Sequence, residues 1–189
     1  MLKKNIQFIG IFAKDQLQAQ QLLLNLTQQT LQLLNEQYQN DQELENMLKQ
    51  LKQNYKFPPS IHLTSLFVGN NPKNLKSQAF TEFKENLDQD IIIDAIAISP
   101  NNIVTAISNH NYQIPLTNKY SHVTTLLGSW KPKDSNQLLE EVFKEISYEE
   151  MQKQVEDNKF WKIQLFQGHI AYVVQLKQKI IIPGVCKMH

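Results

Sequence analysis

The pattern His-apolar-Thr-x-Leu occurs twice in this sequence, first in Ile61-His62-Leu63-Thr64-Ser65-Leu66 and again in Ser121-His122-Val123-Thr124-Thr125-Leu126. Sixty residues separate the two histidines, and a glycine follows each copy, at Gly69 and Gly128. The chain has five His and eight Thr among 189 residues, so chance would place Thr two positions after two or more histidines in roughly 2 % of cases. We therefore interpret the pair as a repeated motif.

The two-residue repeat of a β-strand explains the spacing within each copy. Alternate residues of a strand lie on the same side of a sheet, so His62 lies beside Thr64 and His122 beside Thr124. If the two strands are neighbours, two imidazoles and two hydroxyls converge. One neutral imidazole can then accept a proton from water, a protonated one can donate to a leaving oxygen, and the hydroxyls can hold a phosphate. The pattern predicts cleavage of a phosphodiester without a metal ion.

These motifs resemble those of the two-histidine (2H) phosphoesterase superfamily, which includes the cyclic phosphodiesterase domains of RNA ligases and related RNA-end-processing enzymes. The resemblance implies an α+β fold, bilobed and pseudo-twofold, with antiparallel sheets around a central cleft and helices on the outside. It also implies hydrolysis of a 2′,3′-cyclic phosphate, to a 2′- or a 3′-phosphate, by His62 and His122, with Thr64 and Thr124 on the phosphate. The partner would be an RNA terminus or a cyclic nucleotide, and no cofactor or metal is implied.

The rest of the chain reads as alternating strands and helices. A capping pattern at Asp15 and Gln18 opens a helix that Asn40 and Asp41 interrupt, and a second helix then runs to Phe57. A short helix is expected around residues 75–87, and a further one opens at Asp134. Strands are expected over residues 6–14, 60–69, 91–98, 103–108, 120–127, 160–166 and 170–176, and the tail after residue 176 has no assigned role. We expect one two-lobed α+β domain over residues 1–189.

The composition excludes several classes of function. The basic residues are 19 Lys with no Arg, so neither an arginine finger nor a bidentate arginine clamp on phosphate is possible. The single cysteine excludes a disulfide framework, and a net charge of +1 argues against a long basic surface for nucleic acid. The 23 Gln and 17 Asn are spread along the chain and carry no functional weight.

The N-terminus and the apolar runs bear on the cellular location. Residues 1–4 are followed by an apolar stretch of only eight residues without a small-residue cleavage site, so we expect an ordinary first strand and not a signal peptide. We expect no association with a membrane, because no apolar run approaches the length of a membrane span. The expected location is intracellular, either cytoplasmic or nuclear.

A few other side chains are candidates near the motifs. Trp130 could stack on a nucleobase, and Lys73, Lys131 and Lys133 follow the two motif strands and could attract a phosphate. Each also has an ordinary role, as a core or rim aromatic or as a solvated loop lysine. The remaining histidines are expected to be structural or solvent-exposed: His110 in a polar turn, His169 in a hairpin and His189 as a loose terminal residue.

Two other interpretations of the motifs stay open at this point. His62 and His122 could be half-buried strand residues with no function, accompanied by Thr because β-branched residues suit strands. Alternatively, the fold could serve as a catalytically idle binding or scaffold subunit of a larger assembly. The Gln-rich helical region of residues 15–55 would then contact a protein partner.

Overall fold

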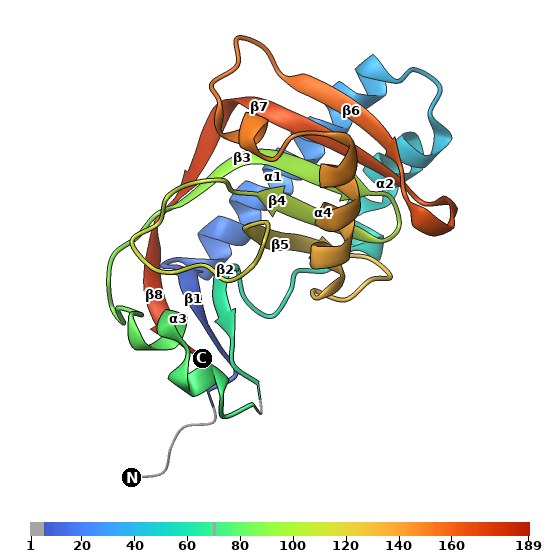
Figure 1. Ribbon diagram of the computed structural model, residues 1–189. Coiled ribbons are helices and arrows are strands. Elements are labelled where there is room, and N and C mark those ends of the chain that lie inside the picture. Colours follow the sequence, from blue (N-terminus) through green and yellow to red (C-terminus); the bar gives the residue numbers. More distant parts are fainter. Residues whose placement is uncertain (1–5, 70) are drawn as a thin grey trace.

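The computed structural model describes residues 6–69 and 71–189, which form an α+β fold with two antiparallel sheets (Figure 1). The strands are β1 (Phe8–Ala13), β2 (His62–Phe67), β3 (Ile91–Ser99), β4 (Ile103–Ile107), β5 (His122–Leu127), β6 (Lys159–Gln164), β7 (Ile170–Ile182) and β8 (Gly184–Met188). The three-stranded sheet has the order β2-β1-β8, and the five-stranded sheet has the order β5-β4-β3-β7-β6. The α+β prediction is confirmed. Residues 1–4, considered above as part of a signal peptide, lie outside the described residues.

The helices are α1 (Gln16–Gln37), α2 (Gln42–Asn54), α3 (Gln78–Thr81) and α4 (Asp134–Glu145). Asp15 caps α1 by accepting from the amide of Gln18, as predicted. Asp41, expected only to interrupt the helical region, caps α2. The helix expected to open at Asp134 does begin there, but Asp134 is not its cap: Lys133 is the cap residue, and the Asp134 carboxylate accepts from the amide of Lys131. Among the described residues, no helix is both long enough and apolar enough to cross a membrane.

The five-stranded sheet is covered on both faces, as Figure 1 shows with α1 behind it and α4 in front. The core behind the sheet joins α1 and α2 to the three-stranded sheet and includes Leu63 and Leu66 of β2 and Val123 and Leu126 of β5. The core in front packs α4 against the other face. Leu17, in the first turn of α1, lies outside both cores and is 79 % exposed.

The C-terminal tail completes the three-stranded sheet. β7 continues to Ile182, beyond the predicted hairpin, and β8 then pairs antiparallel with β1, so that Ile9 lies opposite Met188. The short helix expected around residues 75–87 is reduced to α3 and a single 3₁₀ turn at Asn74–Lys76. The tail is therefore a structural part of the sheet that carries β2.

The two motif strands occupy equivalent positions in their sheets. Both are edge strands, and each pairs with its neighbour through a β-bulge. The extra residue is Ser65 in β2 and Thr125 in β5, the same position in each motif, and both are fully buried. β2 and β5 also contact each other, so that the two sheets meet along these edges. This repetition places the two motifs side by side.

Candidate functional site

The side chains of both motifs point to the same side of the molecule. Leu63 and Leu66 of β2 lie in the same core as Val123 and Leu126 of β5, and side chains alternate along a strand. The His and Thr side chains of both motifs therefore point away from that core. The structure thus brings His62, Thr64, His122 and Thr124 to two adjoining strand edges, facing the same side.

Both imidazoles lie against the carbonyl oxygen two residues before them. Nδ1 of His62 lies 3.1 Å from the carbonyl oxygen of Ser60 and 3.0 Å from the Ser60 hydroxyl, which can accept from the same N–H, and Nδ1 of His122 lies 2.8 Å from the carbonyl oxygen of Tyr120. A carbonyl oxygen only accepts, so each Nδ1 carries a hydrogen and donates it. In the neutral ring the lone pair is then on Nε2. Both histidines therefore present Nε2 as the atom available for proton transfer.

Burial keeps both rings neutral in the free protein. Burial, with smaller contributions from the nearby His122 and His189, lowers the pKa of His62 to about 4. Burial likewise lowers the pKa of His122, whose residue is only 8 % exposed. An anion between the rings favours a protonated imidazole, so binding of a phosphate is expected to bring a proton to one of them.

The surroundings of His62 are aromatic. Its ring stacks on Phe8 and Phe12, with centroids 4.6 and 5.1 Å away. His189 packs against the same two phenylalanines. The backbone of His189 is hydrogen-bonded to Phe8, so the expectation of a loose terminal residue was wrong. These rings exclude water from one side of the His62 imidazole.

Thr124 is held by a chain of hydroxyls. Its Oγ1 lies 2.9 Å from Oγ of Ser135, which lies 2.8 Å from Oγ1 of Thr105. Ser135 and Thr105 are fully buried, and Ser135 stands in the first turn of α4. The Thr124 hydroxyl also donates to the Pro132 carbonyl, over 3.5 Å. When hydrogens run from Thr105 through Ser135, a ligand oxygen can replace Pro132 in this long hydrogen bond and accept from Thr124. The sequence offered no signal for Ser135, because it contacts Thr124 across the sheet face and not along the strand.

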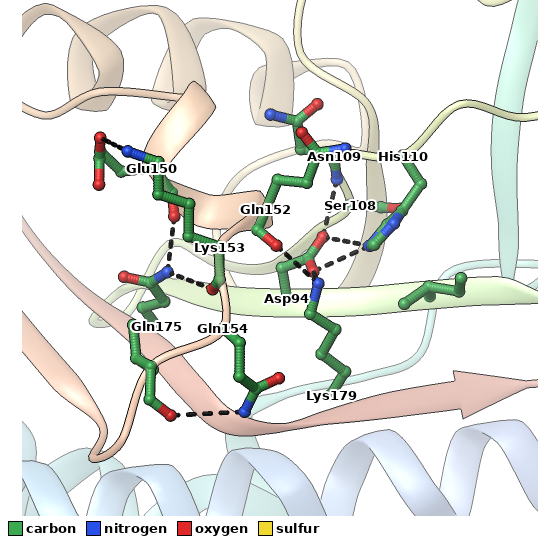
Figure 2. Close-up of polar contacts among 12 residues, drawn as sticks. Asp94, Ser108, Asn109, His110, Glu150, Gln152, Lys153, Gln154, Gln175 and Lys179 are labelled. Atoms are coloured by element: carbon green, nitrogen blue, oxygen red, sulfur yellow. Dashed lines mark hydrogen bonds and ion pairs between the residues drawn. The ribbon is translucent and has the colours of Figure 1, made fainter.

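The sequence prediction for His110 was also wrong. It is not an exposed turn residue: its side chain is 16 % exposed, and its Nε2 lies 2.8 Å from Asp94, whose side chain is fully buried. Figure 2 shows the Asp94 carboxylate between His110, Lys179 and the backbone amide of Asn109. A carboxylate inside an apolar strand needs such partners. The network fixes the start of the loop that leads from β4 to His122.

The other candidate residues lie outside this group. Trp130 lies beyond the end of β5 that is opposite His122 and packs edge-on against His169, with centroids 5.4 Å apart. Lys73, Lys131 and Lys133 are exposed. Nδ1 of His169 lies 3.3 Å from the Asn102 amide, in agreement with a structural role.

In residues 6–69 and 71–189, no group of three or more His, Cys, Asp and Glu side chains is arranged to hold a metal ion. An open hollow of about 850 Å³ lies between α4 and the segment 164–166, lined mainly by charged and amide side chains. It includes none of the four motif residues.

Comparisons with known proteins bear on the fold alone. No protein-family model matches the chain, and no curated protein matches it in sequence. Its structure is similar to the crystal structure of a fungal RNA kinase, with a TM-score of 0.54 and 13 % sequence identity. The match covers 100 % of this chain and 46 % of the kinase chain, so the chain spans about half the length of that protein. The chain thus shares its α+β fold with part of a fungal RNA kinase.

Proposed function

We propose that this protein is a phosphodiesterase of the two-histidine type, which opens a 2′,3′-cyclic phosphate at an RNA end or in a cyclic nucleotide. The observation that carries the proposal is the equivalence of the two imidazoles. Both stand on adjoining strand edges, both donate from Nδ1 to the carbonyl two residues before them, and neither Nε2 has a hydrogen-bond partner within residues 6–69 and 71–189. A reaction that needs one base and one acid on opposite sides of a phosphorus atom requires such a pair.

The proposed reaction consists of two coupled proton transfers. A water oxygen attacks phosphorus while the neutral imidazole takes a water proton at Nε2. The protonated imidazole donates its Nε2 proton to the ribose oxygen as that oxygen's bond to phosphorus breaks. The products are a phosphate monoester and a ribose hydroxyl, and the two histidines have exchanged protonation states. His62 and His122 supply both transfers, so the step needs no metal ion.

In this proposal the phosphate is held by hydroxyls. Thr64 and Thr124 lie on the same strand faces as the histidines and donate to the non-bridging oxygens. The chain contains no arginine, so a positively charged side chain that contacts the phosphate has to be an imidazolium or a lysine. Such a site suits a single phosphate group better than a long nucleic-acid backbone.

The similarity to an RNA kinase favours an RNA end as the substrate. That structure is of an enzyme that acts on RNA, and this chain matches part of it over its whole length. The structural similarity does not indicate which reaction is catalysed, so the proposal of a cyclic phosphate as substrate rests on the two motifs.

The decisive experiment offers the wild-type protein 2′,3′-cyclic nucleotides and RNA oligonucleotides ending in a cyclic phosphate, in the presence of EDTA. We expect turnover to a monoester that is lost in both His62→Ala and His122→Ala. Lys84→Ala, a change at an exposed lysine, is the matched control and should keep activity. Absence of turnover on every such substrate, or equal activity in the histidine variants, overturns the proposal and favours the idle scaffold subunit.

A further inference from the structure

The peptide group whose carbonyl lies two residues before each histidine makes two hydrogen bonds, one through the carbonyl and one through the N–H. In the second motif, the Tyr120 carbonyl accepts from His122 Nδ1, and the N–H of the same peptide belongs to Ser121. That N–H donates to the hydroxyl of Tyr148 at 3.0 Å. A single rigid peptide plane therefore connects the hydroxyl of Tyr148 to the imidazole.

The first motif repeats this arrangement with a different side chain. The Ser60 carbonyl accepts from His62 Nδ1, and the N–H of the same peptide, that of Ile61, donates to Oε1 of Gln16 at 2.6 Å. Gln16 is itself fixed, because its Nε2 donates to the carbonyls of Ala13 and Ile61, both at 3.0 Å. Gln16 is the first residue of α1, far from His62 in sequence.

Tyr148 is fixed as firmly as Gln16. Its hydroxyl donates to the Ser108 carbonyl at 2.9 Å, and its own carbonyl accepts from the Asn109 side chain at 2.8 Å. Burial raises the pKa of Tyr148, so the hydroxyl stays protonated and can donate and accept at once. Asp94 binds the amide of Asn109, which connects the buried charged network of Figure 2 to this tyrosine.

We propose that Gln16 and Tyr148 are paired positioning residues, each of which orients the peptide that fixes the Nδ1–H form and the direction of one histidine. The inference rests on the proposed function for its catalytic consequence, but its structural content concerns the two imidazoles alone. An acceptor on the peptide N–H polarises the peptide and strengthens its carbonyl as the partner of Nδ1. Removing that acceptor loosens the ring and mixes its two neutral forms.

The test compares Tyr148→Phe and Gln16→Met with Tyr55→Phe. The Tyr55 hydroxyl also accepts from a backbone amide, that of Asn101 at 2.6 Å, at the end of β4 far from His122, which makes it a matched control. Tyr148→Phe keeps the ring that packs on Tyr120 and Phe143, so it is expected to fold. Thermal unfolding of all three variants confirms the fold.

The first readout is the ¹⁵N spectrum of the imidazoles at neutral pH, where the two ring nitrogens of a neutral histidine have different shifts. Tyr148→Phe is expected to bring the two His122 shifts closer together and to leave His62 unchanged, and Gln16→Met to do the reverse. Tyr55→Phe should change neither. A loss of overall stability does not produce this crossed pattern. If Tyr148→Phe leaves the His122 shifts as they are in the control, the proposal is overturned.

The second readout is steady-state kinetics on a cyclic phosphate. Each positioning variant is expected to lower kcat about tenfold with KM changed less than twofold, because the ring direction matters for proton transfer and not for binding. Unchanged kcat in both variants, with an active wild-type protein, contradicts the proposal while the proposed function stands. If the wild-type protein has no activity, the proposed function fails and the spectra alone decide the roles of Gln16 and Tyr148.

Discussion

The β2 half of the site, which is the three-stranded sheet with His62 and Thr64, differs from the β5 half, which is the five-stranded sheet with His122 and Thr124. The imidazoles are held alike, but their surroundings are not. His62 stacks on phenylalanines, and no hydrogen bond from the Thr64 hydroxyl is found among the described residues. The Thr124 hydroxyl, by contrast, is joined to buried Ser135 and Thr105. The two halves thus share the placement of the imidazole, whereas among the described residues only the Thr124 hydroxyl is joined to buried hydroxyl partners.

The largest expected effect tests whether the two histidines act as a unit. His62→Gln and His122→Gln should each lower kcat/KM by about 10³-fold, the range expected for one general acid or base. The double variant should be no more than about tenfold worse than either single variant, because each ring depends on the other. Kinetics on a 2′,3′-cyclic nucleotide measure this. Near-wild-type activity in one single variant would show that the two histidines are not both needed for the reaction.

The next effect concerns stability in acid. The folded protein lowers the pKa of His62 from about 6.5 to about 4, so above pH 6.5 both folded and unfolded chains hold it neutral. As the pH falls from 6.5 to 4, the unfolded chain gains a proton that the folded chain refuses, and the free energy of unfolding decreases. The loss for His62 is at most about 3 kcal/mol.

Urea unfolding at pH 7 and pH 4.5 measures this loss in the wild type and in His62→Gln. The variant should lose less stability between the two pH values than the wild type does. His122→Gln should show the same direction, because burial also lowers the pKa of His122. An unchanged pH dependence in both variants shows that neither ring is held neutral.

A smaller effect on kcat/KM tests whether Ser135 acts through the Thr124 hydroxyl and not through the Thr64 hydroxyl. Ser135→Ala removes the partner of Thr124 and is expected to lower kcat/KM about fivefold, the scale of one hydrogen bond. In a Thr124→Val background the same change should have no further effect, since the hydroxyl it positions is gone. In a Thr64→Val background it should keep its full effect. Equal effects in both backgrounds show that Ser135 acts only through stability.

The smallest effect concerns the exposed lysines that follow the two strands. Lys73→Gln and Lys131→Gln should each raise KM about twofold at low salt, and less at high salt, because exposed charges act weakly and are screened. Lys131 follows the strand that holds Thr124 and should have the larger effect. The dependence of KM on ionic strength measures this. A tenfold increase in KM from Lys73→Gln would contradict the expectation that Lys131 has the larger effect.

Much of the fold was readable from local sequence. The strands around His62 and His122 and the cap Asp15 depend on neighbours a few residues away, and these predictions were right. β8 was missed because its partner β1 lies at the other end of the described chain, and local patterns carry no information on pairing.

Of the candidate site, only the four motif residues could be predicted from the sequence. The spacing of His and Thr within a strand is local, so the four residues could be named. Gln16 and Tyr148 contact backbone groups 45 and 27 residues away, and no periodicity marks such contacts. A signal for His110 did exist and was overlooked: Asp94 stands within an apolar strand and needs partners that a nearby histidine can supply.

The pairing of β1 with β8 constrains how the protein is made. During synthesis β1 is available early, but the strand that completes its sheet follows only after nearly all of the described chain has been translated. Such long-range pairing slows folding and leaves an edge of β1 exposed to other chains in the meantime. The three-stranded sheet that carries His62 is thus completed only after β3 to β7 have been made, and loss of Gly184–Met188 leaves His62 on an incomplete sheet.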